Sequence, residues 1–162
     1  MAKGEIDEMD ELGKMIDGMF SGIDDDGPEP TRVFLICPVR GASEEVKAIL
    51  EAYVARLEAH NYVVHYPDRD TNQVDPDGGI NICRRNTSAI RDADEVHIYY
   101  AKGSSGSLFD SGAAFVLGKP LYLVNPDDIE PTKEKSLENV LLAWGQPSPY
   151  ALKTTKEQPS SS

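Results

Sequence analysis

The 162 residues give room for one domain with a buried core, and contents of 40% apolar and 27% charged residues are ordinary for a globular protein. The formal net charge of −12, with ten acidic residues and two lysines among residues 1–31, leaves no basic stripe for neutralising phosphates, so nucleic-acid binding is disfavoured. No apolar run approaches the roughly 20 residues of a membrane span, the N-terminus lacks the pattern of a secretory signal, and the two cysteines cannot form a multi-bridge framework, so we expect a cytoplasmic protein without membrane association.

Residues 1–31 are an acidic amphipathic leader and linker. Apolar side chains recur at helical spacing between Ile6 and Phe20, which predicts a short amphipathic helix. Residues 22–30 contain three consecutive aspartates and two prolines, which is typical of a linker. Two interpretations of the helix stay open: it packs on its own domain or frays, or it is a docking or oligomerisation segment.

Residues 32–150 alternate short apolar runs with amphipathic segments. The predicted strands are residues 33–37, 62–66, 95–100 and 121–124, with a fifth edge strand expected after about residue 145. One helix is predicted to begin after Ser43, which can cap it. Three further helices are predicted over residues 80–90, 107–117 and 134–144. This alternation predicts right-handed crossovers and a parallel sheet of order 2-1-3-4-5. Residues 151–162 are polar and are predicted to be a disordered tail.

In open parallel sheets, ligands bind beyond the carboxyl ends of the strands. Three predicted loops lie at that edge, namely residues 38–43, 67–79 and 101–107. We therefore expect these loops to carry the function. His65, near the end of the second strand, either faces the ligand or is a plain sheet residue.

The segment 103–112 is rich in glycine and serine, follows a strand and opens a helix. Glycines let backbone N–H groups approach a ligand, and a helix N-terminus attracts negative charge. Its spacing matches neither a Walker loop nor a dinucleotide fingerprint. The candidate ligand-binding residues are Ser104, Ser105, Gly106 and Ser107. The alternative is a turn plus a capping box formed by Ser107 and Asp110.

The segment that follows the first strand is a second candidate ligand-binding site. Pro38, Arg40 and Gly41 come between an apolar strand and a capped helix, an arrangement suited to phosphate. The alternative is a surface arginine beside an ordinary helix N-terminus. Tyr100, at the end of the third strand, either stacks on a base or covers the sheet.

The order and spacing of these segments resemble the nucleoside 2-deoxyribosyltransferase family, including its 2′-deoxynucleoside 5′-phosphate N-hydrolase branch. The resemblance covers residues 32–125 and rests on the Arg40-Gly41 turn and on residues 86–96, 103–114 and 118–120. It implies a flavodoxin-like (Rossmannoid) three-layer α/β sandwich. The implied activity is cleavage of the N-glycosidic bond of a (deoxy)nucleoside or nucleoside 5′-monophosphate through a carboxylate nucleophile, with no metal and no cofactor. A homodimer or higher homo-oligomer is also implied.

The resemblance assigns roles to particular residues. The family nucleophile is the glutamate of a Glu-Leu-Gly triplet, and the matching triplet here is Asp110-Ser111-Gly112, so Asp110 is the candidate nucleophile. We expect the helix N-terminus to keep Asp110 ionised. Asn86 stands where the family has an aspartate, and Pro38 where the phosphate-binding branch has a serine. Arg40 and Ser104 match that branch. The alternative function is a catalytically inactive nucleotide-binding or sensing module of the same fold.

Overall fold

Within residues 3–20 and 27–153, which the computed structural model describes, five strands form one sheet. They are β1 (Thr31–Ile36), β2 (Tyr62–His65), β3 (Glu95–Ile98), β4 (Leu121–Leu123) and β5 (Gln146–Pro147). The sheet order is β2-β1-β3-β4-β5 and every neighbouring pair is parallel. The predicted strand order is confirmed, including the edge strand after residue 145.

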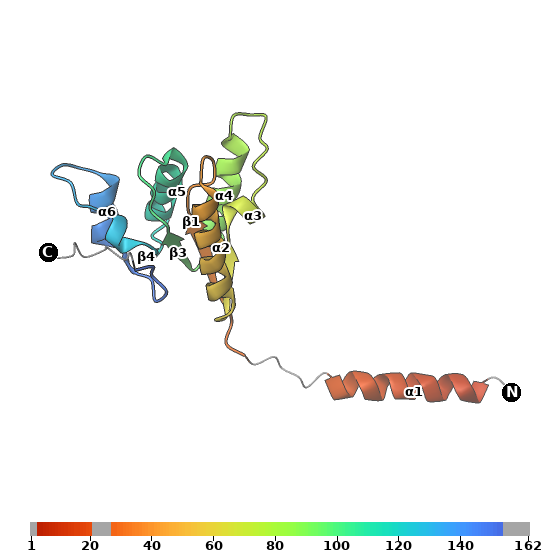
Figure 1. The fold of residues 1–162 in the computed structure, drawn as a ribbon. Coiled ribbons are helices and arrows are strands. Elements are labelled where there is room, and N and C mark those ends of the chain that lie inside the picture. Colours follow the sequence, from red (N-terminus) through yellow and green to blue (C-terminus); the bar gives the residue numbers. More distant parts are fainter. Residues whose placement is uncertain (1–2, 21–26, 154–162) are drawn as a thin grey trace.

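Helices separate the strands along the chain (Figure 1). They are α1 (Lys3–Phe20), α2 (Glu44–Glu58), α3 (Pro67–Asp70), α4 (Ile80–Asp92), α5 (Ser105–Val116), the 3-10 helix η1 (Pro126–Asp128) and α6 (Leu137–Trp144). Helix α3 falls in a segment predicted as loop. A proline at its first position presets the helical φ, and the Asp70 carboxylate accepts a hydrogen bond from the Tyr66 amide at 2.8 Å.

Helix α5 begins two residues earlier than predicted. Its N-cap is Ser104, whose hydroxyl oxygen accepts a hydrogen bond from the Ser107 amide at 3.3 Å. The alternative interpretation, a capping box formed by Ser107 and Asp110, is therefore wrong, because Asp110 lies in the second turn. This shift decides which way the Asp110 side chain points.

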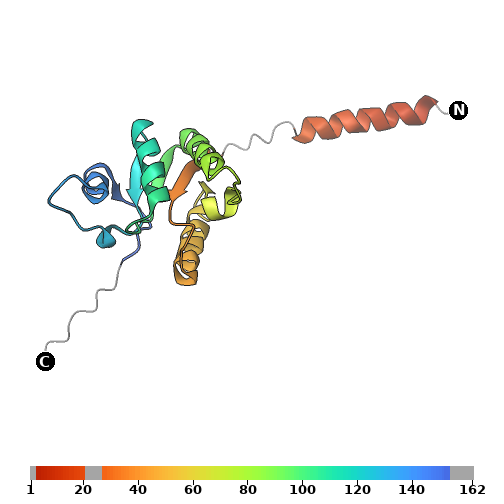
Figure 2. The same ribbon diagram turned by 90° about the horizontal axis from the view of Figure 1, so that it is seen from above.

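The sheet is covered on both faces, which confirms the three-layer α/β sandwich. Val33 and Leu35 of β1 pack with α2, whereas Phe34 and Ile36 pack on the opposite side with buried residues of α4, α5 and α6. Figure 2, seen from above, shows α2 on one side of the sheet and α4 and α5 on the other. Burial of both faces explains why β1 is an unbroken apolar run.

The chain after β5 lies along the sheet. The amide of Ser148 donates to the carbonyl of Leu123 at 2.9 Å, and that of Leu152 donates to Val124 at 2.7 Å. The side chain of Leu152 packs against the α2-side core. The prediction of a disordered tail from residue 151 is wrong for residues 151 and 152, because this apolar side chain has a place in the core. Residues 154–162 lie outside the described residues.

Helix α1 carries the predicted leader helix (Figure 1). Four of its apolar side chains are exposed, namely Leu12, Met15, Ile16 and Met19. Residues 21–26 of the predicted linker lie outside the described residues. In the described parts of the chain, no helix is both long enough and apolar enough for a bilayer span.

Deletion of residues 1–28 is expected to leave a cooperatively folded domain. The truncation removes the exposed hydrogen bond from Asn61 Nδ2 to the Pro28 carbonyl (3.0 Å), which is worth about 1 kcal/mol. A thermal melt of the truncated chain should therefore stay within roughly 3–5 °C of the full chain. Loss of the cooperative transition would instead show that the leader belongs to the core.

Candidate functional site

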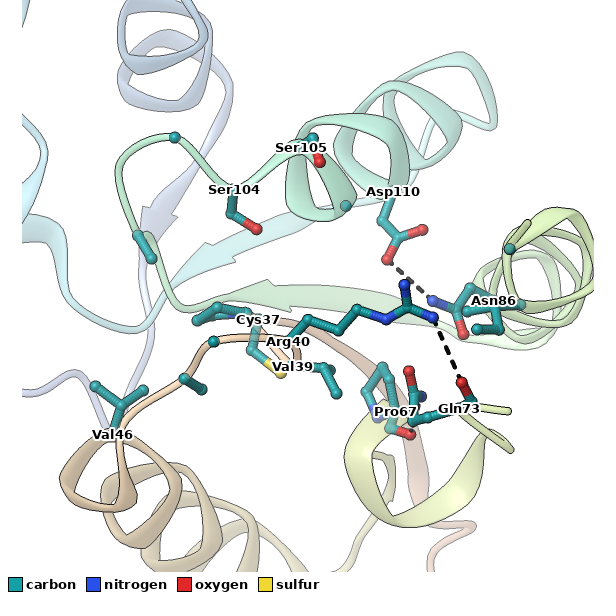
Figure 3. Close-up of a pocket in the computed structure, with 18 of the residues that line it drawn as sticks. Cys37, Val39, Arg40, Val46, Pro67, Gln73, Asn86, Ser104, Ser105 and Asp110 are labelled. Atoms are coloured by element: carbon teal, nitrogen blue, oxygen red, sulfur yellow. Dashed lines mark hydrogen bonds between the residues drawn. The ribbon is translucent and has the colours of Figure 1, made fainter. Parts of the chain in front are cut away.

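A cavity of about 700 Å³ opens at the carboxyl edge of the sheet. This volume is in the usual range of small-molecule sites, about 300–1,000 Å³. Its wall is built by the loops after β1, β2 and β3, the three loops in which the function was expected, together with the first turns of α2, α4 and α5 (Figure 3). The position agrees with the rule for ligands of open parallel sheets.

Most of the predicted site residues meet at this cavity. Those that line it are Pro38, Arg40, Gly41, Asn86, Ser104, Ser105, Gly106 and Asp110. Tyr100 and Ser107 are absent from the lining. The Tyr100 hydroxyl donates to Glu138, and its ring packs on the core beneath α6. Ser107 is buried, and its hydroxyl oxygen accepts a hydrogen bond from Ser104 Oγ at 2.9 Å. Ser107 thus supports the cavity wall from behind through Ser104, whereas the Tyr100 side chain contacts α6.

Asp110 and Asn86, the two candidate catalytic residues, form a hydrogen-bonded pair in the cavity wall. Asp110 projects from α5 and Asn86 from α4, and the two side chains point toward one another (Figure 3). Asn86 Nδ2 donates to Asp110 Oδ2 at 3.2 Å, and the residues are only 6% and 7% exposed, respectively. Helix–helix packing of α4 against α5 therefore brings together two residues that are 24 positions apart.

Burial changes the protonation of Asp110. It raises the pKa of this carboxyl from its ordinary 3.8 to about 6, and the hydrogen bond from Asn86 offsets part of the rise. The expectation that the helix N-terminus keeps Asp110 ionised assigns the wrong cause, because Asp110 lies beyond the first turn of α5 and its burial opposes ionisation. The carboxyl still ionises below neutral pH, so most of it is an anion at pH 7.

Behind Asn86 lies a support that the sequence analysis missed. Thr71 Oγ1 donates to Asn86 Oδ1 at 3.0 Å, and His65 Nε2 lies 2.8 Å from Thr71 Oγ1. The ring of His65 stacks on Phe34, with centroids 5.2 Å apart, so His65 is a sheet residue that holds the site from outside the cavity. The signal for Thr71 was its place in the loop after β2, at the ligand edge of the sheet.

The rest of the lining suits an anion. Ser105 and Gly106, the first residues of α5, line the cavity, and first-turn amides have no carbonyl partner within their own helix. Gly41 (φ 75°) and Gly103 (φ 81°) hold left-handed turns that open the loops before α2 and α5. Arg40 and Lys102 add positive charge. Arg40 Nη2 reaches the Gln73 carbonyl at 3.5 Å, a long contact that a ligand oxygen could replace.

The two cysteines of the lining offer no obvious nucleophile or metal site. Burial raises the pKa of the Cys37 thiol to about 12, so it stays protonated. Cys83 lies on α4 and is half-buried. Over the described residues, no group of three or more His, Cys, Asp or Glu side chains is placed to hold a metal ion.

No family model matches the chain, and no curated protein matches it. Among solved structures, it is similar to the CMP N-glycosidase BcmB of Clostridium botulinum, with 26% identity over 57% of this chain and 70% of that chain and a TM-score of 0.45. It is also similar to a 2-deoxyribosyltransferase of Bacillus psychrosaccharolyticus, with 20% identity over 65% of this chain and 77% of that chain and a TM-score of 0.49.

Proposed function

We propose that this protein cleaves the N-glycosidic bond of a nucleoside 5′-monophosphate, with Asp110 as the nucleophile. The observation that carries the proposal is a buried carboxylate that faces a nucleotide-sized cavity and accepts a hydrogen bond from Asn86. A second support is the position of Asp110 in the triplet that matches the family nucleophile. The cations and helix N-termini of the same cavity suit the phosphate.

The chemistry needs two displacements. The Asp110 carboxylate attacks C1′ of the sugar, the C1′–N bond breaks, and its electron pair leaves with the base. Water then hydrolyses the glycosyl ester, or a second base accepts the sugar. Aspartate is one methylene shorter than the family glutamate, so the sugar must sit closer to α5. Asn86 can hydrogen-bond the base or a sugar hydroxyl, but it cannot donate a proton as a carboxylic acid does.

Arg40→Ala is expected to weaken binding of a nucleoside 5′-monophosphate by about tenfold or more. One charge-assisted hydrogen bond to a phosphate is worth roughly 1.5–3 kcal/mol. Calorimetry on AMP, CMP and the corresponding nucleosides measures the effect, which should be much smaller for the nucleosides. Arg91→Ala is a matched control, because it removes the same charge from an exposed position outside the cavity lining. Equal affinities of the wild type for nucleotide and nucleoside would refute the phosphate assignment.

A second candidate function is nucleotide sensing without cleavage. The observation that favours it is Asn86, which puts an amide where an acid would protonate the leaving base. Incubation with the ribo- and deoxyribonucleoside 5′-monophosphates, followed by chromatography for free base, separates the two candidates. Release of base from any of them supports the enzyme, whereas tight binding with no release from any supports the sensor.

We also propose that the protein works as a homodimer or higher homo-oligomer. Leu108 and Phe109, which precede Asp110 on α5, expose 56% and 54% of their surface and could contact an apolar surface of a second copy. Light scattering in solution tests the proposal, and a monomer at micromolar concentration would contradict it.

A further inference from the structure

A chain of hydrogen bonds, partly buried at His65 and buried beyond it, leads from the sheet to the reactive carboxylate. It runs from His65 to Thr71, from Thr71 to Asn86, and from Asn86 to Asp110. Thr71, Asn86 and Asp110 are 4%, 6% and 7% exposed, so water cannot readily substitute for these partners. Buried polar groups in such a chain are costly to leave unpaired.

The direction of each bond follows from the available protons. The hydroxyl of Thr71 has one proton, which it donates to Asn86 Oδ1. Thr71 Oγ1 must therefore accept from His65, which places the imidazole proton on Nε2. With Oδ1 of Asn86 held by Thr71, its Nδ2 faces Asp110, and a flipped amide would instead set an oxygen against a carboxylate.

We propose that Thr71 is a positioning residue, whose hydrogen bond fixes the amide of Asn86 with its N–H groups toward Asp110 and the cavity. The inference rests on the proposed function only for its catalytic consequence. When Asp110 is protonated, or is bound as a glycosyl ester, it no longer selects this orientation through its negative charge. Thr71 then keeps the donor in place, ready for the returning carboxylate.

The orientation matters because a donor facing Asp110 stabilises the anion and opposes the effect of burial. The other titratable groups that line the cavity are Cys37 after β1, Cys83 on α4, Arg40 before α2 and Lys102 before α5. Asp70 and Arg69 act on His65 from α3. Substitutions at Thr71 leave all of these groups in the chain, so a change in the titration of Asp110 reports on Asn86.

The experiment compares Thr71→Val with Thr71→Ser in the full chain. Valine matches threonine in shape and lacks the hydroxyl, whereas serine keeps it. NMR titration of the Asp110 carboxyl carbon should give a pKa near 6 for the wild type and for Thr71→Ser, and between about 6.5 and 7 for Thr71→Val. The proposal is overturned if folded Thr71→Val titrates like the wild type, or if Thr71→Ser moves as far as Thr71→Val.

A wild-type measurement covers the case in which Thr71→Val does not fold. The side-chain amide resonances of Asn86 should shift with pH along the same curve as the Asp110 carboxyl, because Nδ2 donates to it. The proposal would be overturned if the Asn86 side-chain amide resonances did not shift over the pH range in which Asp110 titrates.

Failure of the proposed function gives a different result. If the wild type releases base, the acidic limb of the pH profile of kcat/KM should have a higher apparent pKa in Thr71→Val than in the wild type. In Thr71→Ser this apparent pKa should equal that of the wild type. Titrations that behave as expected without any base release would count against the enzyme and leave the role of Thr71 intact. If the wild type releases base but Asp110 has the same pKa in Thr71→Val as in the wild type, the result would count only against the positioning role of Thr71.

Discussion

Asp110→Asn is expected to lower base release by about a thousandfold or more while nucleotide binding stays within a few fold. The substitution keeps the shape of the side chain and an oxygen that can accept the hydrogen bond from Asn86 Nδ2. It removes the anionic nucleophile, without which no glycosyl ester forms. Chromatography of free base and calorimetry with the same nucleotide measure the two quantities.

Asp92→Asn is the matched control, because it makes the same chemical change at an exposed residue outside the cavity lining. It should leave base release unchanged. Equal cleavage by the wild type and Asp110→Asn would end the nucleophile assignment. A wild type that binds nucleotides tightly but releases no base would support the second candidate function, nucleotide sensing without cleavage.

The sheet could be predicted from the sequence because its strands carry a strong local signal. Val33 to Ile36 are consecutive apolar residues, and a short run of this kind that ends at a proline is typical of a strand buried on both faces. Once parallel order is set, the loops after β1, β2 and β3 must meet at one edge. The position of the cavity can therefore be predicted from the strand order alone, without knowledge of the side-chain contacts.

The details of the site depended on contacts that have no local signature. Both Ser104 and Ser107 stand where the N-cap of α5 could form. Because Ser104 is the N-cap, Asp110 lies in the second turn of the helix, where it is buried and does not cap it. The desolvation of Asp110 comes from the packing of α5 against α4, which spacing does not reveal. Likewise, the bond from Thr71 to Asn86 joins a loop to a helix across 15 residues.

The burial of Asp110 has a thermodynamic consequence that does not depend on any substrate. The folded carboxyl has a pKa of about 6 and the unfolded one its ordinary 3.8, so the folded state binds the proton more tightly. The protonated form thus adds stability below about pH 4, and this stability is lost as the pH rises through about 6. The difference is roughly 3 kcal/mol, since each pKa unit corresponds to 1.36 kcal/mol.

Asp110→Asn is accordingly expected to be more stable than the wild type at pH 7, by about 2–3 kcal/mol, and about as stable at pH 4. The amide is neutral at both pH values, so it avoids the cost of burying a charge. Urea unfolding of both chains at the two pH values measures the difference, in which all other titrating groups are shared and largely cancel. Asp92→Asn reports what the same change does at an exposed site. If Asp110→Asn were less stable than the wild type at pH 7, and this difference shrank as the pH fell to 4, the carboxylate would be stabilising the fold. A variant that gains stability as it loses base release would instead show that Asp110 is kept charged and buried at a cost to folding, as a nucleophile requires.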